Sequence, residues 1–262
     1  MEVHHPHHAP KNWKEYFGEF FMLFMAVSLG FLVENQREHY VEGQREKELA
    51  HSLYLETKAD SVELANILKF RKMKENYLNF LYENYRGDVE DTLLQKQFQI
   101  AQFVGVNANS TILYEPRHAI LRQLESSGML RYFKDEHLQS TILNVINTGE
   151  TVRTRMQRET DAYHQFVLPV FIKIQNFDLN RKLTENGKIN KPLTGLYFDY
   201  LHSNAFYVFQ KIKPTPAYLV ELKKSLEFYR FLLSSTRSLH LKNYQKYNAD
   251  LLADLRRIYH IH

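Results

Sequence analysis

Apolar residues recur along most of this chain at steps of three or four, the spacing that gathers them on one face of an α-helix. The pattern is longest in two segments, residues 34–86 and residues 217–260, and the second contains neither Gly nor Pro. At about 1.5 Å per residue, the second segment would exceed about 60 Å in length. The apolar positions therefore predict long helices at both of these places.

Turn-forming residues divide the chain after the first long segment. The sequence Arg-Gly-Asp at residues 86–88 is expected to end that helix, and a second helix is expected over residues 89–104. Residues 105–110, which contain Gly, Ser and two Asn, are expected to form a polar loop. A short helix then follows over residues 117–126, with Gly128 as its C-cap.

The second half of the chain predicts three more elements. Asp135 is a suitable N-cap for a helix that runs toward residue 176, and Gly149 and Pro169 are expected to bend or interrupt it. A loop is expected over residues 176–192, and a smaller helix over residues 196–212.

These elements predict an all-α fold, in which the long helices form an elongated antiparallel bundle. Only nine Gly and seven Pro occur in 262 residues, a composition that favours helices over a turn-rich β fold. No repeat or low-complexity linker divides the body into two domains.

One apolar run, residues 20–33, contains no charged residue. Alone it would cover about 21 Å, which is shorter than the roughly 30 Å hydrocarbon core of a bilayer. Extending it back to Trp13 gives a plausible span, with Lys14 and Glu15 at the level of the lipid headgroups. We therefore predict a mobile His-rich tail over residues 1–12, a transmembrane helix over residues 13–33, and a helical body over residues 34–262 that the membrane helix enters directly.

The residues assigned to the span are Trp13, Tyr16, Glu19, Phe20, Phe24, Leu29 and Val33. Two other interpretations of the run are a secretory signal peptide and the core helix of a soluble bundle. Against the signal peptide, no A-x-A-like cleavage site follows the run, which passes into a charged, helix-favouring segment.

Basic residues do not decide the orientation of the span. Lys11 and Lys14 precede it, and Arg37, Arg45 and Lys47 follow it. A long helical body can be exported regardless of its charge.

The charge and the motifs exclude several classes of function. The net charge is +4, but acidic and basic residues alternate along the chain, so no nucleic-acid partner is predicted. The absence of cysteine excludes disulfides, thiol catalysis and thiolate metal sites. Phosphate-binding Gly-rich loops, G-x-S-x-G elbows and H-E-x-x-H pairs are absent from the sequence, so neither an enzyme nor a cofactor site is predicted.

Three groups of residues suggest more specific roles. The histidines of the tail, His4, His5, His7 and His8, are interrupted by Pro6 and lack a further ligand at a defined spacing, so no metal site is predicted. Glu19 either pairs with another membrane helix or extends toward the headgroups. The aromatic residues Tyr197, Tyr200, Phe206 and Tyr207 are a candidate ligand or partner surface, although core packing is the commoner use of such a cluster.

Two sets of motifs resemble an uncharacterised family of small bacterial single-pass membrane proteins. The first set consists of Gly18-Glu19 before the apolar run, ENQRE at residues 34–38 after it, and Leu53 and Asp60 on the charged helix that follows. The second consists of Ser110-Thr111, Leu121, LESSGML at residues 124–130 and DEHL at residues 135–138. The resemblance implies an anchor in the bacterial inner membrane and a helical body in the periplasm, without an established activity.

Two functions are consistent with these expectations. The first is a membrane-anchored interaction or scaffold protein, whose partners are the lipid bilayer and either another protein or a second copy of the chain. The second is a membrane-tethered sensor, whose helical body binds a small ligand and signals through the membrane helix. An enclosed pocket with converging polar groups would favour the sensor.

Overall fold

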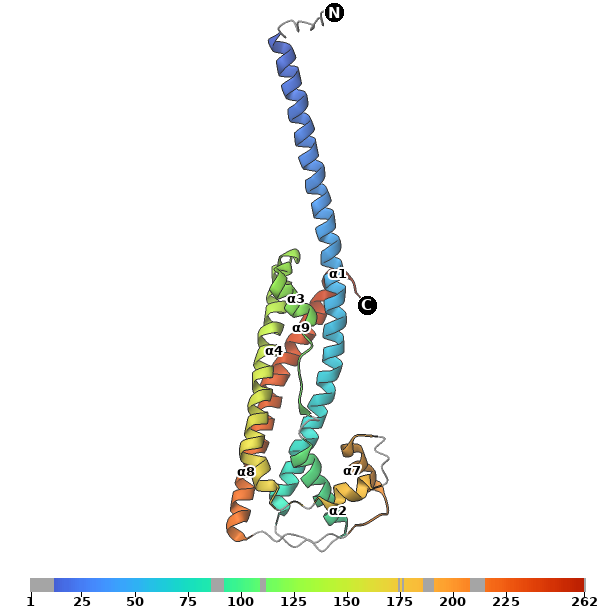
Figure 1. Ribbon diagram of the computed structural model, residues 1–262, viewed down its shortest axis with the longest axis vertical. Coiled ribbons are helices and arrows are strands. Elements are labelled where there is room, and N and C mark those ends of the chain that lie inside the picture. The colour runs from blue at the N-terminus through green and yellow to red at the C-terminus, as the bar shows by residue number, and fades with distance from the viewer. Residues whose placement is uncertain are drawn as a thin grey trace, which may run out of the picture.

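The computed structural model describes residues 12–85, 92–108, 112–173, 175, 177–185, 191–207 and 215–261. These residues are helical apart from short connections and contain no β-strand, which confirms the predicted all-α class (Figure 1). The histidines at positions 4, 5, 7 and 8 lie outside the described residues.

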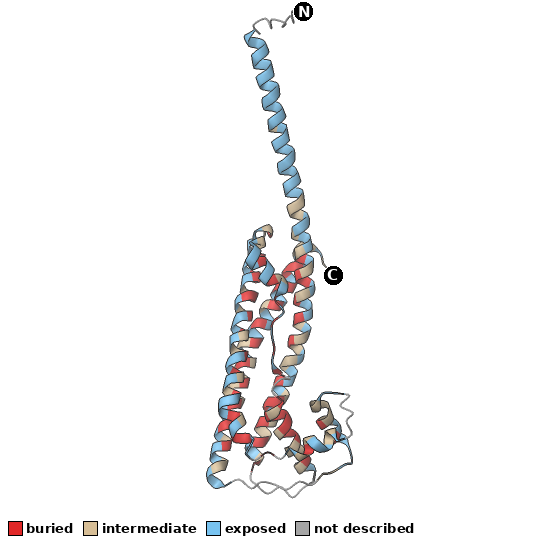
Figure 2. Ribbon diagram, in the orientation of Figure 1, coloured by how far each residue is buried: buried red, intermediate tan, exposed pale blue. Residues whose placement is uncertain are grey.

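Helix α1 (Trp13–Asn84) is a single helix of 72 residues, and it has the length of about 110 Å expected for that number. Its N-terminal part is long and apolar enough to cross a membrane, and the body buries none of that window (Figure 2). Burial on α1 begins at Ala50. The predicted membrane helix is therefore continuous with the first helix of the body.

The remaining helices belong to four groups along the chain. The first group is α2 (Thr92–Ile100) with the π-helical segment η1 (Ala101–Asn107). The second is α3 (Ala119–Ser127) with the 3₁₀ turn η3 (Met129–Tyr132). The third is α4 (Glu136–Ala162), the π-helical η4 (Tyr163–Val167), α5 (Leu168–Phe171), α6 (Asp178–Thr184) and α7 (Leu193–His202). The last is α8 (Pro216–Ser235), the π-helical η5 (Thr236–Leu241) and α9 (Lys242–Tyr259).

Three long helical segments lie side by side in the body (Figure 1). The α1 and α4 helices run in the same direction, and the segment α8–η5–α9 returns in the opposite direction and contacts both. An extended segment, residues 112–118, connects the α2 end of the body to the α3 end. Its side chains are alternately buried and exposed, as in a strand with one face toward a core. We call residues 112–118 the strap.

Local signals explain where several helices begin and end. Asp135 accepts a hydrogen bond from the Leu138 N–H at 2.8 Å and so caps α4, as predicted. Gly128 has a φ of 68° and ends α3 in the left-handed conformation, also as predicted. Pro169 lies in the first turn of α5, and a π-helical turn separates that helix from α4, so the predicted interruption is confirmed.

Three local predictions were wrong. Residues 105–107 continue η1 instead of starting a loop, because Gly105 allows its backbone to approach α1, where an added Cβ would lie 3.2 Å from the Tyr77 Cβ. The expected loop over residues 176–192 contains α6, which buries Leu179. The expected helix over residues 196–212 begins at Leu193 and ends at His202, and residues 208–212 lie outside the described part of the chain.

The core of the body consists of three apolar clusters. One lies near α3 and includes Leu53 and Leu255, and the second includes Leu81 and Leu226. The third lies between η1 and α7 and includes Tyr197. Buried polar side chains of α1 lie within and between the first two clusters, and they define the candidate sites.

Candidate functional site

Asp60 of α1 is buried and is the centre of a polar network inside the body. Its Oδ1 accepts hydrogen bonds from the Tyr114 hydroxyl at 2.6 Å and from the Arg117 N–H at 2.9 Å. Its Oδ2 accepts hydrogen bonds from the Tyr244 hydroxyl at 2.8 Å and the Asn248 amide at 2.7 Å. Four donors from the strap and α9 thus satisfy the carboxylate, and Asp60 fastens both segments to α1.

His118, at the end of the strap, extends this network. Its Nε2 lies 2.9 Å from the Tyr244 hydroxyl oxygen. Because that hydroxyl donates its proton to Asp60, the His118 Nε2 must be the donor, which leaves Nδ1 as an acceptor in the neutral ring. Burial lowers the pKa of His118 to about 4, so the ring is neutral at pH 7.

The His118 ring also explains why position 149 of α4 is a glycine. A Cβ at position 149 would lie 1.9 Å from the His118 Cε1, so only glycine leaves room for the ring. The helix continues through Gly149, so the interruption that the sequence allowed there does not occur. Gly149 is therefore needed for packing against His118.

Replacing Gly149 with Ala is expected to lower the free energy of unfolding by about 1 to 3 kcal/mol, because the added methyl group forces His118 away from Tyr244. Gly43→Ala is the matched control, since nothing lies within 4 Å of its added Cβ. Because Gly43 lies in a helix interior, the Gly43→Ala substitution should raise the free energy of unfolding by about 0.5 to 1 kcal/mol. The measurement is chemical denaturation of both variants, followed by circular dichroism. An equal increase in the free energy of unfolding of both variants would contradict this packing role.

The pKa of His118 also predicts a dependence of stability on pH. The folded protein holds this pKa at about 4, below the 6.5 of an unperturbed histidine, so the unfolded chain binds the proton first as the pH falls. This contribution is complete above pH 6.5 and is lost between pH 6.5 and 4. The difference between 6.5 and about 4 corresponds to a loss of roughly 3 kcal/mol. The free energy of unfolding, measured by denaturation at several pH values in this range, should depend less on pH for His118→Gln, because glutamine does not titrate. The same pH dependence in the variant and the wild type would contradict this role of His118.

A surface cleft adjoins the Asp60 network. Its volume is about 540 Å³, which is within the range of small-molecule sites. The polar residues of its lining are Glu56, Glu115, Arg117, His118 and Arg122. It lies where α1, the end of the strap and the start of α3 meet. This is the cleft in which charged groups of both signs converge.

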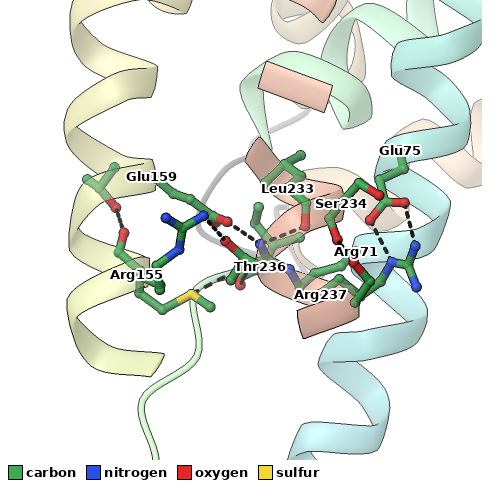
Figure 3. A network of polar contacts seen from close by, with 12 residues as sticks. Arg71, Glu75, Arg155, Glu159, Leu233, Ser234, Thr236 and Arg237 are labelled. Atoms are coloured by element: carbon green, nitrogen blue, oxygen red, sulfur yellow. Dashed lines mark hydrogen bonds and ion pairs between the residues drawn. The ribbon is translucent and has the colours of Figure 1, made fainter. Parts of the chain in front are cut away.

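A second polar network surrounds Arg71, which is fully buried (Figure 3). Its Nη2 donates to Glu159 Oε1 at 2.5 Å and to the Leu233 carbonyl oxygen at 3.5 Å. Its Nη1 donates to the Ile112 carbonyl oxygen at 3.2 Å. The guanidinium group therefore joins α1 to the strap, α4 and α8.

Two neighbouring contacts complete the junction around η5. Arg237 forms a two-pronged pair with Glu75, with distances of 2.6 and 2.9 Å (Figure 3). The Arg155 Nη2 lies 3.4 Å from the hydroxyl oxygen of Thr236, which is fully buried. Ionic groups of α1, α4 and η5 thus meet inside the protein, where solvent screens their interactions weakly.

Lys74 is a second buried basic residue of α1. Its Nζ donates to the Ala108 carbonyl oxygen at 3.2 Å and to the Val106 carbonyl oxygen at 3.4 Å. Burial, together with the positive charge of the nearby Arg71, lowers the pKa of Lys74 to about 7. Lys74 therefore holds the carbonyl end of η1, where the helix dipole favours a positive charge.

Three of the aromatic residues selected from the sequence, Tyr197, Tyr200 and Tyr207, belong to the third apolar cluster. Tyr197 is only 2% exposed and stacks on Phe103, with ring centroids 4.1 Å apart. Tyr200 is also buried and stacks on the half-buried Tyr207, with centroids 5.4 Å apart. Phe206 is half-buried beside them in sequence. Tyr197 and Tyr200 contribute to packing between η1 and α7, and the cleft described above lies elsewhere.

The residues assigned to the membrane span are all exposed. Trp13 is 77% exposed and Val33 is 67% exposed, and Tyr16, Glu19, Phe20, Phe24 and Leu29 are exposed as well. Rings four residues apart stack along the helix, with centroids 6.3 Å apart for Phe20 and Phe24. An apolar surface this large is unusual on a soluble monomer and is typical of a membrane or partner contact.

Sequence reasoning noted Asp60 only as part of a family resemblance, and it overlooked Arg71, Lys74 and His118. The Arg-Lys-Met-Lys-Glu sequence at residues 71–75 has the appearance of a solvated face. The buried partner of Arg71 lies 88 residues later, and nothing local signals that pairing.

No protein-family model matches this chain, and neither the curated proteins nor the solved structures include a significant match to it. The resemblance to a family of bacterial single-pass membrane proteins therefore stays a prediction from its motifs.

Proposed function

We propose that this chain is a single-pass membrane-anchored interaction or scaffold protein, which holds a helical body at a distance from a bacterial inner membrane. The observation that carries the proposal is the apolar N-terminal window of α1, of which the body buries none. A core helix of a soluble bundle would be mostly covered by its neighbours. The lipid bilayer is the partner that fits this window.

The part of α1 between the span and the body supports a spacer role. Residues 34–49 are helical, are not buried, and precede Ala50, the first buried residue of α1. We call residues 34–49 the stalk. At about 1.5 Å per residue the stalk is about 24 Å long. It would hold the body clear of the lipid headgroups, where a protein partner or a second copy of the chain can approach it.

The body itself is suited to a scaffold because its helices are fastened by buried ionic contacts. The Arg71–Glu159 pair and the Asp60 network both require partners from several segments at fixed positions. Such networks favour one arrangement of the helices over alternatives. We propose that the body is in the periplasm and presents a fixed surface.

Fractionation of cells that express the chain with a C-terminal epitope tests this proposal. The epitope should be found in the membrane fraction and should be lost when intact spheroplasts are treated with protease. A protease-resistant epitope in the membrane fraction would place the body in the cytoplasm. An epitope in the soluble fraction would contradict the anchor.

A ligand sensor is the second candidate, and the cleft beside Asp60 favours it. Glu56 and Ala59, which line the cleft, are residues of α1, the helix that also forms the predicted span. A ligand in the cleft would therefore contact the same continuous helix that enters the membrane. A change at the cleft could therefore be transmitted along α1 to the predicted span. A partner protein would have to convert that change into a response.

A further inference from the structure

The charged residues that line the cleft are of both signs. Glu56 and Glu115 contribute two carboxylates, and Arg117 and Arg122 contribute two guanidinium groups. His118 is neutral at pH 7, because burial lowers its pKa to about 4. The cleft therefore has no excess of either charge.

One residue of each sign is already engaged by another part of the protein. The Arg117 guanidinium pairs with Glu63, with its Nη2 2.7 Å from Glu63 Oε2. The Glu56 carboxylate accepts the Ile120 N–H at 3.1 Å and so holds the start of α3. These two side chains build the wall of the cleft.

The other two charged side chains are available to a ligand. Arg122 is exposed on α3 and makes no ion pair with any residue that the structure describes. Glu115 has a side chain that is 76% exposed, and its nearest cation is the Arg153 Nε at 3.8 Å. Arg122 thus lines the cleft without an ion pair to any described residue, and Glu115 lines it with one long, solvent-exposed pair to Arg153 that a ligand could replace.

We propose that this cleft binds a small zwitterion, an α-amino acid or a close analogue, whose carboxylate pairs with Arg122 and whose ammonium group pairs with Glu115. The inference rests on the second proposed function, in which the cleft is a ligand site. Ala59, Pro116 and Ala119 also line the cleft and supply apolar surface for the side chain of the ligand. A pure anion would be repelled by Glu56 and Glu115, and a pure cation by the two arginines.

The position of the cleft separates this ligand from a lipid headgroup. Glu56 lies 23 positions after Val33, which at about 1.5 Å per residue places it about 35 Å from the end of the span. The anchoring bilayer does not reach that far. The ligand must therefore arrive in solution.

The test measures binding of free amino acids to the detergent-solubilised full-length protein by isothermal titration calorimetry, after a thermal-shift screen of all twenty. The best ligand is then compared with its N-acetyl derivative, which lacks the ammonium group, and its amide, which lacks the carboxylate. Each derivative should bind at least about tenfold more weakly, because each loses one charge-assisted pair.

Three variants complete the test. Arg122→Gln and Glu115→Gln should each weaken binding by about tenfold or more, and Arg158→Gln, which alters an exposed arginine of α4, should not. The proposal is overturned if none of the amino acids binds saturably at about 10 mM, if both derivatives bind as well as the parent, or if Arg122→Gln binds like the wild type. Membrane fractionation of the same variants should be normal, so a failure here leaves the anchor unaffected.

Discussion

Replacing Arg71 with Met is expected to lower the free energy of unfolding by about 3 to 5 kcal/mol. The substitution leaves the Glu159 carboxylate buried without its cation, and it also removes the hydrogen bonds to the Ile112 and Leu233 carbonyl oxygens. Urea denaturation of the detergent-solubilised protein, followed by circular dichroism, would measure the loss. This is the largest effect on stability that we expect from a single polar substitution in the body.

A double variant separates two contributions to this loss of stability, the loss of the ion pair and the burial of the unpaired Glu159 carboxylate. Arg71→Met combined with Glu159→Leu should recover much of the stability, because replacing both members of a buried ion pair removes the unpaired charge. Arg237→Met is the comparison at the neighbouring pair, where the Arg237 side chain is 17% exposed and the penalty should be smaller. If Arg71→Met alone costs less than about 1 kcal/mol, the Arg71–Glu159 pair does not hold the helices together in solution.

Replacing Leu29 with Arg is expected to shift the protein from the membrane fraction to the soluble fraction. Leu29 lies in the uncharged run at residues 20–33, and an arginine costs up to about 2.5 to 3.5 kcal/mol on the insertion scale, the full amount applying at the centre of a membrane helix. The measurement is the ratio of membrane-bound to soluble protein after alkaline extraction. Unchanged retention would mean that this run is not in the bilayer.

The same substitution outside the span is the matched control. Tyr40 is 70% exposed on the stalk, seven positions after Val33, so Tyr40→Arg should leave membrane retention unchanged. Release by both variants would indicate a general loss of folding and not a failure of insertion. Release by Leu29→Arg alone would support the predicted span.

Features set by neighbouring residues were predictable from the sequence. The caps at Gly128 and Asp135 depend on the conformations that single residues favour, and both were predicted correctly. The long helices were predictable because their apolar positions repeat at the helical period. The continuity of α1 followed from the absence of any helix-breaking signal between the apolar run and the charged segment.

Features set by distant residues were not predictable. The strap follows a helix in sequence, but its path depends on Arg71, Asp60 and Tyr114, which meet only in the folded body. Gly149 was expected to bend or interrupt α4, because glycine is a poor helix former and the sequence does not show that the His118 ring occupies the space beside it. The cleft likewise needs three segments in contact, and none of its charged residues forms a local motif.

The stalk has a thermodynamic consequence if the chain is anchored as proposed. An isolated helix of about 12 to 15 residues is only marginally stable in water, because nucleation is costly. The stalk is of similar length, and its own contribution includes a surface pair between Arg37 Nε and Glu34 Oε2 at 2.9 Å. Most of its helicity must therefore come from the ordered segments at its two ends. Amide hydrogens of residues 34–49 should exchange slowly when the span is inserted and quickly after release, so that the stalk reports the state of the membrane end of the molecule.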